Sequence, residues 1–298
     1  MTNGPATIQS PEPVATGVHG GIDAAGMSNV GRSRSGNEDA FLIATLQRSL
    51  LVHDSSPRKA AAATVGLSGT LLMVADGMGG EGGGDVASCM AVNTVASYLL
   101  NLMPWTAALA TFDEPGAADL EGSLTSALVV GDAHVRLAAA HSATPRMGTT
   151  LTMALVFWPT LYLAHVGDTR CYLLRAGQFS RLTTDHTMAQ KVTEATAEPI
   201  DPASELHHVL WNSLGGNESL PEPQIVKLKL EVNDRLLFCS DGLTKHVSDQ
   251  QILATLAVGP NMVVCERLIA LANDAGGSDN VTVLVADARA FQLTPAAS

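Results

Sequence analysis

The hydrophobic pattern of the chain changes several times between helical and β-type spacing. Apolar residues recur at helical spacing in four segments, and short β-prone runs bounded by turn formers lie between and around them. The expected helices are 86–102, 120–141, 248–256 and 262–273. The expected strands are 70–75, 149–157, 161–166, 171–175, 178–182, 224–230, 235–239 and 281–286. Since these elements occur in blocks without a regular β-α-β period, the pattern predicts a layered α+β fold.

The segments between these elements complete the expected organisation. The four strands from residue 149 to 182 are separated only by short turns, so we expect an antiparallel meander. Residues 48–69 carry turn formers and charge and indicate a loop or hairpin, while 185–212 is expected to form helical turns and a mobile flap. We expect one domain over residues 21–290, with tails at 1–20 and 291–298.

The charge of the chain argues against polyanionic partners. The formal net charge is -12, so neither nucleic acid nor a membrane surface is expected as a partner. An acidic protein can still act on phosphate groups where bound cations reverse the local field. The most apolar stretch, from Val86 to Leu109, is interrupted by polar residues and Pro104, and we expect a core helix there rather than a membrane span.

The cysteines bear on the cellular compartment. None of the four belongs to a CxxC pair, and most lie in apolar runs, so we expect reduced, buried thiols and a cytoplasmic protein. They are Cys89, Cys171, Cys239 and Cys265.

Four aspartates share one kind of position, where an apolar strand meets a glycine or a turn. Carboxylates at strand ends of a shared core can converge on one rim, and burying several like charges together requires cations. Oxygen ligands without Cys or a clear His partner favour magnesium or manganese. Any one of these aspartates alone is better explained as a turn residue, but four together favour a metal site. They are Asp76, Asp168, Asp241 and Asp279.

A fifth acidic position lies near the start of the expected domain. Glu38 and Asp39 follow Arg34 in a glycine-containing approach to an apolar run. A cation and an acidic pair this close in sequence can place a phosphate clamp beside a metal. The alternative is a solvated charge pair on a loop.

Other active-site types have weaker support. Residues 77–82 fit GxGxxG after an expected strand, but Asp76 and Glu81 would place negative charge at a bound pyrophosphate. No acidic residue lies between Asp85 and Asp113 to hold a ribose. The chain also lacks a GxSxG elbow and a Cys-x5-Arg loop, so neither a serine nor a cysteine nucleophile is indicated.

The histidines show no metal-binding spacing of the HxxxH or HExxH kind. His165 lies within an expected strand, where a core histidine satisfied by the backbone is the simplest explanation. His186, His207 and His208 fall in the expected flap, where they could position a substrate, although a structural role is the simpler reading.

Seven segments, in order, resemble those of the metal-dependent protein phosphatases of type 2C, the PPM family, in its bacterial single-domain form. The resemblance extends over nearly the whole chain from about residue 22 and is far more specific than a lone Asp-Gly pair. The segments are GRSRSGNEDAF (31–41), LLMVADGMGG (71–80), GTTLTMALV (148–156), LYLAHVGDTRCYLLRAGQFSRLTTDHT (161–187), HHVLWNSLGG (207–216), DRLLFCSDGLTKHVSD (234–249) and GGSDNVTVLVAD (276–287).

The resemblance implies a four-layer α-β-β-α sandwich, with two central antiparallel β-sheets flanked by helix pairs. It also implies a site for two divalent cations, Mn²⁺ or Mg²⁺, at one end of the sandwich, with a third ion bound weakly. Asp76 resembles the carboxylate that bridges both metals, helped by the carbonyl of Gly77. Asp241 and Asp279 resemble ligands of the first metal.

The remaining motif positions resemble supporting parts of the same site. Asp39, with Glu38 as an auxiliary, resembles the ligand of the second metal. Asp168 resembles a ligand of the third, shared with Asp241. Arg34 resembles the phosphate-binding arginine and, with Asp76, a catalytic residue. Asn280 resembles a residue that supports the ligands from behind.

The implied activity is hydrolysis of phosphoserine and phosphothreonine in proteins, by direct attack of a hydroxide that bridges the two metals. The implied partners are phosphorylated proteins and a cognate Ser/Thr kinase, and the implied state is a monomer. A non-catalytic relative would be expected to lack a metal carboxylate, yet every one is present. Glu81 and Met78 occupy positions where relatives carry histidines, which leaves the identity of a general acid open.

Overall fold

The computed structural model describes residues 19–50, 65–79, 82–102, 120–201, 203–216 and 219–291. The two expected tails lie outside the described residues except for residues 19, 20 and 291. Most of the expected loop at 48–69 and the departure at Glu81 lie outside them as well.

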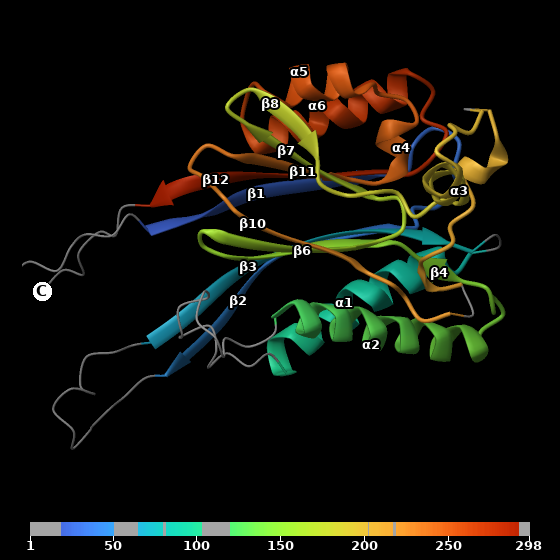
Figure 1. Ribbon diagram of the computed structural model, residues 1–298, viewed down its shortest axis with the longest axis horizontal. Coiled ribbons are helices and arrows are strands. Elements are labelled where there is room, and N and C mark those ends of the chain that lie inside the picture. The colour runs from blue at the N-terminus through green and yellow to red at the C-terminus, as the bar shows by residue number, and fades with distance from the viewer. Residues whose placement is uncertain are drawn as a thin grey trace, which may run out of the picture.

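Two antiparallel β-sheets form the centre of the described structure (Figure 1). One sheet has the strand order β1 (His19–Asn29), β12 (Val281–Phe291), β11 (Arg235–Cys239), β7 (Arg170–Arg175) and β8 (Gln178–Arg181). The other has the order β10 (Gln224–Lys229), β6 (Thr160–Val166), β5 (Leu151–Phe157), β3 (Val65–Met78), β4 (Gly148–Thr149) and β9 (Leu214–Gly215), with β2 (Asp39–Leu50) paired to β3.

Helices cover the outer face of each sheet, as Figure 1 shows. The seven-stranded sheet is covered by α1 (Gly84–Leu102) and α2 (Leu120–Ala140). The five-stranded sheet is covered by α4 (Asp241–Thr244), α5 (Asp249–Leu256) and α6 (Asn261–Asp274). Helix α3 (Met188–Thr196) and the 3₁₀ turn η2 (Glu205–His207) lie at one end. The predicted four-layer α-β-β-α sandwich is therefore confirmed.

The position of β5 and β6 inside the larger sheet explains why their sequences are continuously apolar. Every residue of β5 and β6 is buried. In β5, Leu151, Met153 and Leu155 pack toward α1 and α2. Ala154 and Val156 pack between the two sheets. A strand covered on both faces needs apolar side chains in both directions, so strict alternation is lost.

The expected meander is wrong at one point. Strands β5 and β6 pair with each other, and β7 pairs with β8, but β6 and β7 belong to different sheets. The link between them turns at Gly167, whose φ of +106° lies in a region that glycine tolerates best. The chain crosses from one sheet to the other at this turn, and Asp168 is therefore placed between the sheet ends.

Other expectations need smaller corrections. The predicted helices match α1, α2, α5 and α6 to within two residues at each end. Strands β1 and β2 were not recognised as separate strands in the sequence pattern. Cys89 is exposed, whereas the other three cysteines are buried and free. In the part of the chain that the structure describes, no helix is both long and apolar enough to span a bilayer.

Candidate metal and active site

The expected metal carboxylates gather where the two sheets end side by side. In the larger sheet, Asp39 at the start of β2 is the register partner of Asp76 in β3. Residues directly opposite each other on antiparallel strands have adjacent side chains, and like charges there destabilise the pair. This register therefore brings two carboxylates together without any need for a long loop.

The smaller sheet contributes two more aspartates to the same end. Asp241 follows β11 and begins α4, while Asp279 lies two residues before β12. Because β11 and β12 are neighbouring antiparallel strands, the end of one lies beside the start of the other. Asp168, on the β6–β7 crossing, lies between the two sheets. All five aspartates thus reach one region from both sheets.

A pocket of about 960 Å³ opens at this place. It is bordered by most of the residues that the sequence singled out, and Asp39 lies close by without lining it. The charged residues on its wall are Arg34, Glu38, Asp76, Asp85, Asp168, Asp241, Lys245 and Asp279, and Gly77, Met78 and His208 also contribute. The acidic residues that the sequence pattern indicated therefore form much of this wall, whereas Asp85 and Lys245 carry no comparable signal in the sequence.

The carboxylates strongly disfavour one another's ionisation. Burial, together with the charge of Asp241, raises the pKa of Asp39 to about 7 and that of Asp168 to about 8. The pKa of Asp76 is raised well above its usual value, first by burial and then by the charges of all four other aspartates. Asp76 is therefore the electrostatic centre of the cluster.

Asp279 behaves in the opposite way. Burial raises its pKa, but the hydrogen bond and charge of Lys245, followed by Arg34, outweigh burial and lower the pKa below its usual value. The Nε atom of Arg34 lies 2.9 Å from an oxygen of Asp279, and half of the Arg34 side chain is exposed. Lys245 and Arg34 therefore reverse the direction of the pKa shift at Asp279.

The residues present fit hard divalent cations. Among the described residues, Oδ1 of Asp39 and Oδ1 of Asp241 are buried carboxylate oxygens without a hydrogen-bond donor. Buried polar atoms of folded proteins are nearly always satisfied, so these two atoms indicate a missing partner. The groups here that could bind a metal do so through oxygen atoms, which suit Mg²⁺ or Mn²⁺ better than zinc.

The carboxylates of this cluster do not all face one common point. In the described part of the chain, no three His, Cys, Asp or Glu side chains have the geometry of a metal site. Two of the carboxylates contact a lysine: Lys245 Nζ lies 2.6 Å from Asp241 Oδ2 and 2.8 Å from Asp279 Oδ2. One oxygen of each of these two aspartates is therefore paired with an ammonium group.

Asn280 ties the loop that carries Arg34 and Glu38 to the start of β12. Its side-chain oxygen accepts a hydrogen bond from the Glu38 amide at 2.8 Å. Its side-chain nitrogen donates to the carbonyls of Val30 and Gly36, each at 2.9 Å. This buried side chain thus supports the acidic pair from behind, the place that the resemblance implied for it.

Backbone contacts fix the central aspartate in a similar way. The Asp76 amide donates to the Thr150 hydroxyl at 2.9 Å, and the Thr149 hydroxyl donates to the Asp76 carbonyl at 2.9 Å. The next residue, Gly77, is buried, and a Cβ atom there would overlap the carbonyl oxygens of Gly84 and Glu38. The chain can therefore turn toward the pocket only with glycine at this position.

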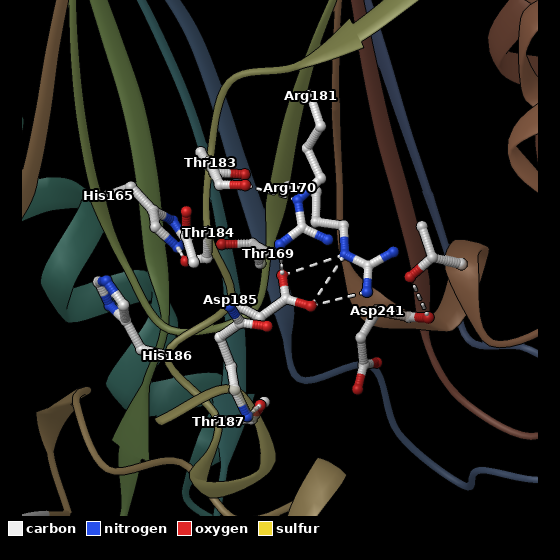
Figure 2. Close-up of polar contacts among 12 residues, drawn as sticks. His165, Thr169, Arg170, Arg181, Thr183, Thr184, Asp185, His186, Thr187 and Asp241 are labelled. Carbon is white, nitrogen blue, oxygen red and sulfur yellow. Dashed lines mark hydrogen bonds and ion pairs between the residues drawn. The ribbon is translucent and has the colours of Figure 1, made fainter. Parts of the chain in front are cut away.

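A charged network lies near Asp168 and affects its pKa, and Figure 2 shows its members Arg170, Arg181 and Asp185. Arg170 and Asp185 form an ion pair with a shortest distance of 2.7 Å, and Arg181 lies 3.1 Å from the same carboxylate. Figure 2 shows the Asp185 carboxylate directed at the Arg170 guanidinium, with Asp241 beyond this pair. The sequence pattern assigned Asp185 to the flap and gave no sign of its ion pairs, which depend on the placement of β7 and β8.

The histidines behind this network are structural. His165 is buried, and its ring nitrogens contact the Thr152 hydroxyl at 2.7 Å and the Thr184 carbonyl at 3.0 Å. Its ring lies 4.8 Å from that of His186. Burial lowers the pKa of His165 to about 3 and that of His186 to about 4, so both are neutral at pH 7. The prediction of a satisfied core histidine at position 165 is confirmed.

The raised carboxylate pKa values lead to a testable pH dependence. Between about pH 4 and pH 8 the folded protein binds more protons at Asp39 and Asp168 than the unfolded chain does. Below about pH 6.5 the neutral histidines His165 and His186 oppose this trend, because the unfolded chain binds more protons at them than the folded protein does. The free energy of unfolding of the metal-free protein is therefore expected to fall between about pH 6.5 and pH 8, by on the order of a few kcal/mol. Asp279, whose pKa is lowered, changes its contribution only at lower pH.

Urea denaturation at pH 6.5 and pH 8, with and without Mn²⁺, measures this dependence. Saturating Mn²⁺ should remove most of the loss at pH 8, because cations neutralise the same carboxylates. Equal stability at the two pH values in the absence of Mn²⁺ would contradict a shared acidic cluster.

Comparison with known families and structures places this geometry in context. The sequence model of the family described as "Protein phosphatase 2C" matches residues 51–270. This match contains Asp76, Asp168 and Asp241 but ends before Asp279 and begins after Asp39.

Individual relatives and solved structures show the same likeness. "Serine/threonine protein phosphatase PstP" of Mycobacterium tuberculosis is 39% identical over 222 residues, which is 73% of this chain and 40% of that protein. This chain thus spans less than half the length of that relative. "Protein phosphatase PhpP" of Streptococcus pneumoniae is 30% identical over 219 residues, which is 72% of this chain and 84% of PhpP.

Two of the solved structures extend the comparison to most of the fold. The catalytic domain of PstP "in complex with 2 Manganese ions" aligns with a TM-score of 0.68 and 33% identity, covering 90% of this chain and 98% of that one. Stp1 of Staphylococcus aureus aligns with a TM-score of 0.71 and 26% identity, covering 93% and 99% of the two chains.

Proposed function

The chain belongs to the protein phosphatase 2C family, and on this premise we propose that it hydrolyses phosphoserine and phosphothreonine in proteins with the help of divalent cations. The observation that carries the proposal is the convergence of five aspartates from two sheets, with two buried carboxylate oxygens that have no donor among the described residues. The PstP structure with two manganese ions supports two cations as the cofactors.

The described residues would share the work of holding the cations. Asp76 would help to hold both, because the charges of all four other aspartates act on its carboxylate. Asp241 and Asp279 would hold the first cation, and Asp39 with Glu38 the second. Asp168 would contribute to a third, weakly bound ion. When bound, such cations polarise phosphoryl oxygens and lower the pKa of water.

The protein itself would orient the phosphate and limit its approach. Arg34 stands at the pocket wall with half of its side chain exposed, so its guanidinium can bind two phosphoryl oxygens. Such charge-assisted hydrogen bonds from Arg34 would hold the phosphorus atom of the substrate in place relative to Asp76 and Asp241. No protein nucleophile is needed, and the described cysteines do not line the pocket.

Phosphate release from a phosphothreonine peptide tests the proposal. The wild-type protein should release phosphate in the presence of Mn²⁺ and lose this activity with a chelator. Asp241→Asn should be strongly impaired under the same conditions, because one buried oxygen of the site is replaced by an amide. Equal turnover by Asp241→Asn and wild type would overturn the assignment of the site.

Arg34 offers a second test, of substrate binding. Arg34→Ala is expected to raise KM for the phosphopeptide by roughly tenfold or more, because a charge-assisted hydrogen bond to phosphate is lost. Arg34→Lys should recover part of the loss, since it keeps the charge but not the bidentate geometry. Arg289→Ala is a matched control, since Arg289 forms ion pairs with Asp23 and Asp287 outside the pocket wall.

The alternative of dinucleotide binding has little structural support. Strand β3 and helix α1 flank the glycine-rich segment as such a motif requires, but β3 belongs to an antiparallel sheet. The acidic wall would also repel a pyrophosphate. Retention of NAD by the protein, without metal-dependent phosphate release, would favour this alternative.

We also propose the setting in which the enzyme works. Its substrates would be phosphorylated by a cognate Ser/Thr kinase, and it would act as a monomer in the cytoplasm. The family relationship supports the first point, and the three buried free thiols, Cys171, Cys239 and Cys265, are compatible with a reducing compartment.

A further inference from the structure

Lys245 occupies an unexpected place in the acidic pocket. Its ammonium nitrogen forms ion pairs of 2.6 Å with Asp241 and 2.8 Å with Asp279, the two aspartates that would hold the first cation. Only 28% of the Lys245 side chain is exposed. The lysine therefore fills the space between these carboxylates and is more than a surface charge near them.

Local structure places Lys245 there. The residue follows the short helix α4, four positions after Asp241, and its amide donates to the Asp241 carbonyl at 2.8 Å. Residues four apart on a helical turn have neighbouring side chains. Asp279 lies in the segment before β12. The ammonium group therefore links two segments that are far apart in the sequence.

We propose that Lys245 is an internal cation that competes with a divalent metal ion for the Asp241–Asp279 pair and so sets the metal concentration at which this site fills. The inference rests on the proposed function, because it assigns the first cation to these two aspartates. It concerns regulation by metal availability and adds no step to the reaction.

Competition follows from the oxygens involved. Lys245 engages Oδ2 of both aspartates, and Arg34 engages Oδ1 of Asp279. Of the four carboxylate oxygens of Asp241 and Asp279, only Oδ1 of Asp241 is among the buried atoms of the described residues that have no donor. A divalent ion that used these carboxylates would place a second positive charge beside the ammonium group, so the lysine must leave before the ion binds with full affinity.

The competition should affect one metal position and spare the other. In the described part of the chain, no lysine or arginine forms an ion pair with Asp39, assigned to the second cation, or with Asp76, assigned to both. An ion that binds beside these two residues does not need to displace Lys245. The two ions are therefore expected to bind with different affinities, the weaker at the Asp241–Asp279 pair.

The lysine can leave without unfolding the site. Its backbone is held at the end of α4, while its long side chain forms part of the open pocket wall. Such a side chain can move its ammonium group into water while the carbon chain stays against the protein. If the displaced state is populated to about 10%, the apparent dissociation constant is about tenfold above the intrinsic one.

Calorimetric titration of the metal-free protein with Mn²⁺ tests the proposal. Of the two binding events assigned to Asp76, Lys245→Met should tighten the weaker by about tenfold and leave the tighter one within about twofold. Lys245→Arg, which keeps the charge, should not tighten it. Lys227→Met is the matched control, because it removes the same charge from an exposed position outside the pocket wall and should leave both events unchanged.

The outcomes separate this proposal from the proposed function. An unchanged weaker event in Lys245→Met, or the same tightening in Lys227→Met, would overturn the competition. If neither wild type nor Lys245→Met binds Mn²⁺, the metal-dependent function itself fails. Circular dichroism of each variant shows whether the fold is retained.

Chemical labelling gives a second readout that does not depend on affinity. An amine-acetylating reagent should modify Lys245 several-fold faster in the presence of saturating Mn²⁺, because the metal releases the ammonium group from its two carboxylates. The labelling rate of Lys227 should not change. Equal labelling of Lys245 with and without Mn²⁺ would contradict its displacement.

Discussion

Asp76→Asn is expected to lower kcat/KM for a phosphothreonine peptide by on the order of 10³-fold. The carboxylate of Asp76 is the one that all four other aspartates affect, so no other single change should disturb both cations as strongly. Asparagine has nearly the same shape and keeps the backbone contacts of Asp76 with Thr149 and Thr150. The loss should therefore reflect charge and metal binding, not a collapse of the fold.

Thermal unfolding of the same variant distinguishes these causes. In metal-free buffer at pH 8, Asp76→Asn should be as stable as wild type or more stable, because one repelling charge has been removed. Added Mn²⁺ should stabilise wild type much more than the variant. Asp274→Asn, which alters a largely exposed aspartate paired with Arg32, should change neither property. Wild-type activity in Asp76→Asn would contradict its central place in the site.

Among the glycines that line the pocket, Gly77→Ala is expected to reduce stability and metal binding the most. The added Cβ would overlap backbone carbonyl oxygens of Gly84 and Glu38, which cannot move as a flexible side chain would. Relief requires β3 to separate from the Glu38 loop, where the Gly77 amide now donates to the Glu38 carbonyl at 3.1 Å. The expected cost is about 1–3 kcal/mol of unfolding free energy or more, with Mn²⁺ affinity reduced at least tenfold.

Urea denaturation and Mn²⁺ titration of Gly77→Ala measure the two effects. Gly36→Ala is the matched control, since a Cβ at Gly36 would meet no atom within 4 Å and its loop borders the same pocket. Wild-type stability and metal affinity in Gly77→Ala would show that the close approach of these backbones is not required.

The acidic site was predictable because its members mark the ends of clear strands. Asp168, Asp241 and Asp279 each adjoin a run of apolar residues. Such a run predicts a strand, and the residues next to it lie at an end of the sheet regardless of which strands pair. Asp39 was also indicated, beside Glu38 and Arg34, but a solvated charge pair on a loop remained an alternative, because its strand β2 has a weaker pattern. Asp39 faces Asp76 only through the register of two paired strands.

The sheet crossing at Asp168 could not be read from the sequence. The pattern of β6 and β7 is compatible with neighbouring strands, and nothing local shows that they lie in different sheets. The crossing depends on the turn at Gly167 and on the packing of both sheets around a common core. Long-range packing of this kind leaves only a weak local signal.

Lys245 was missed for a different reason. It lies within a recognised motif, but helix α4 has only four residues, too few to show a helical pattern. Its two partners are separated by 38 positions in the sequence, since Asp241 precedes it and Asp279 follows it by 34. The ion pairs become apparent only when β11 and β12 are placed side by side.

The central claim is that aspartates from both sheets form one cation site. The most direct measurement is anomalous X-ray scattering at the manganese edge from crystals soaked in Mn²⁺. Two strong peaks are expected, both beside Asp76, one also contacting Asp241 and Asp279 and the other near Asp39. Well-ordered carboxylates without any manganese peak between them would contradict it.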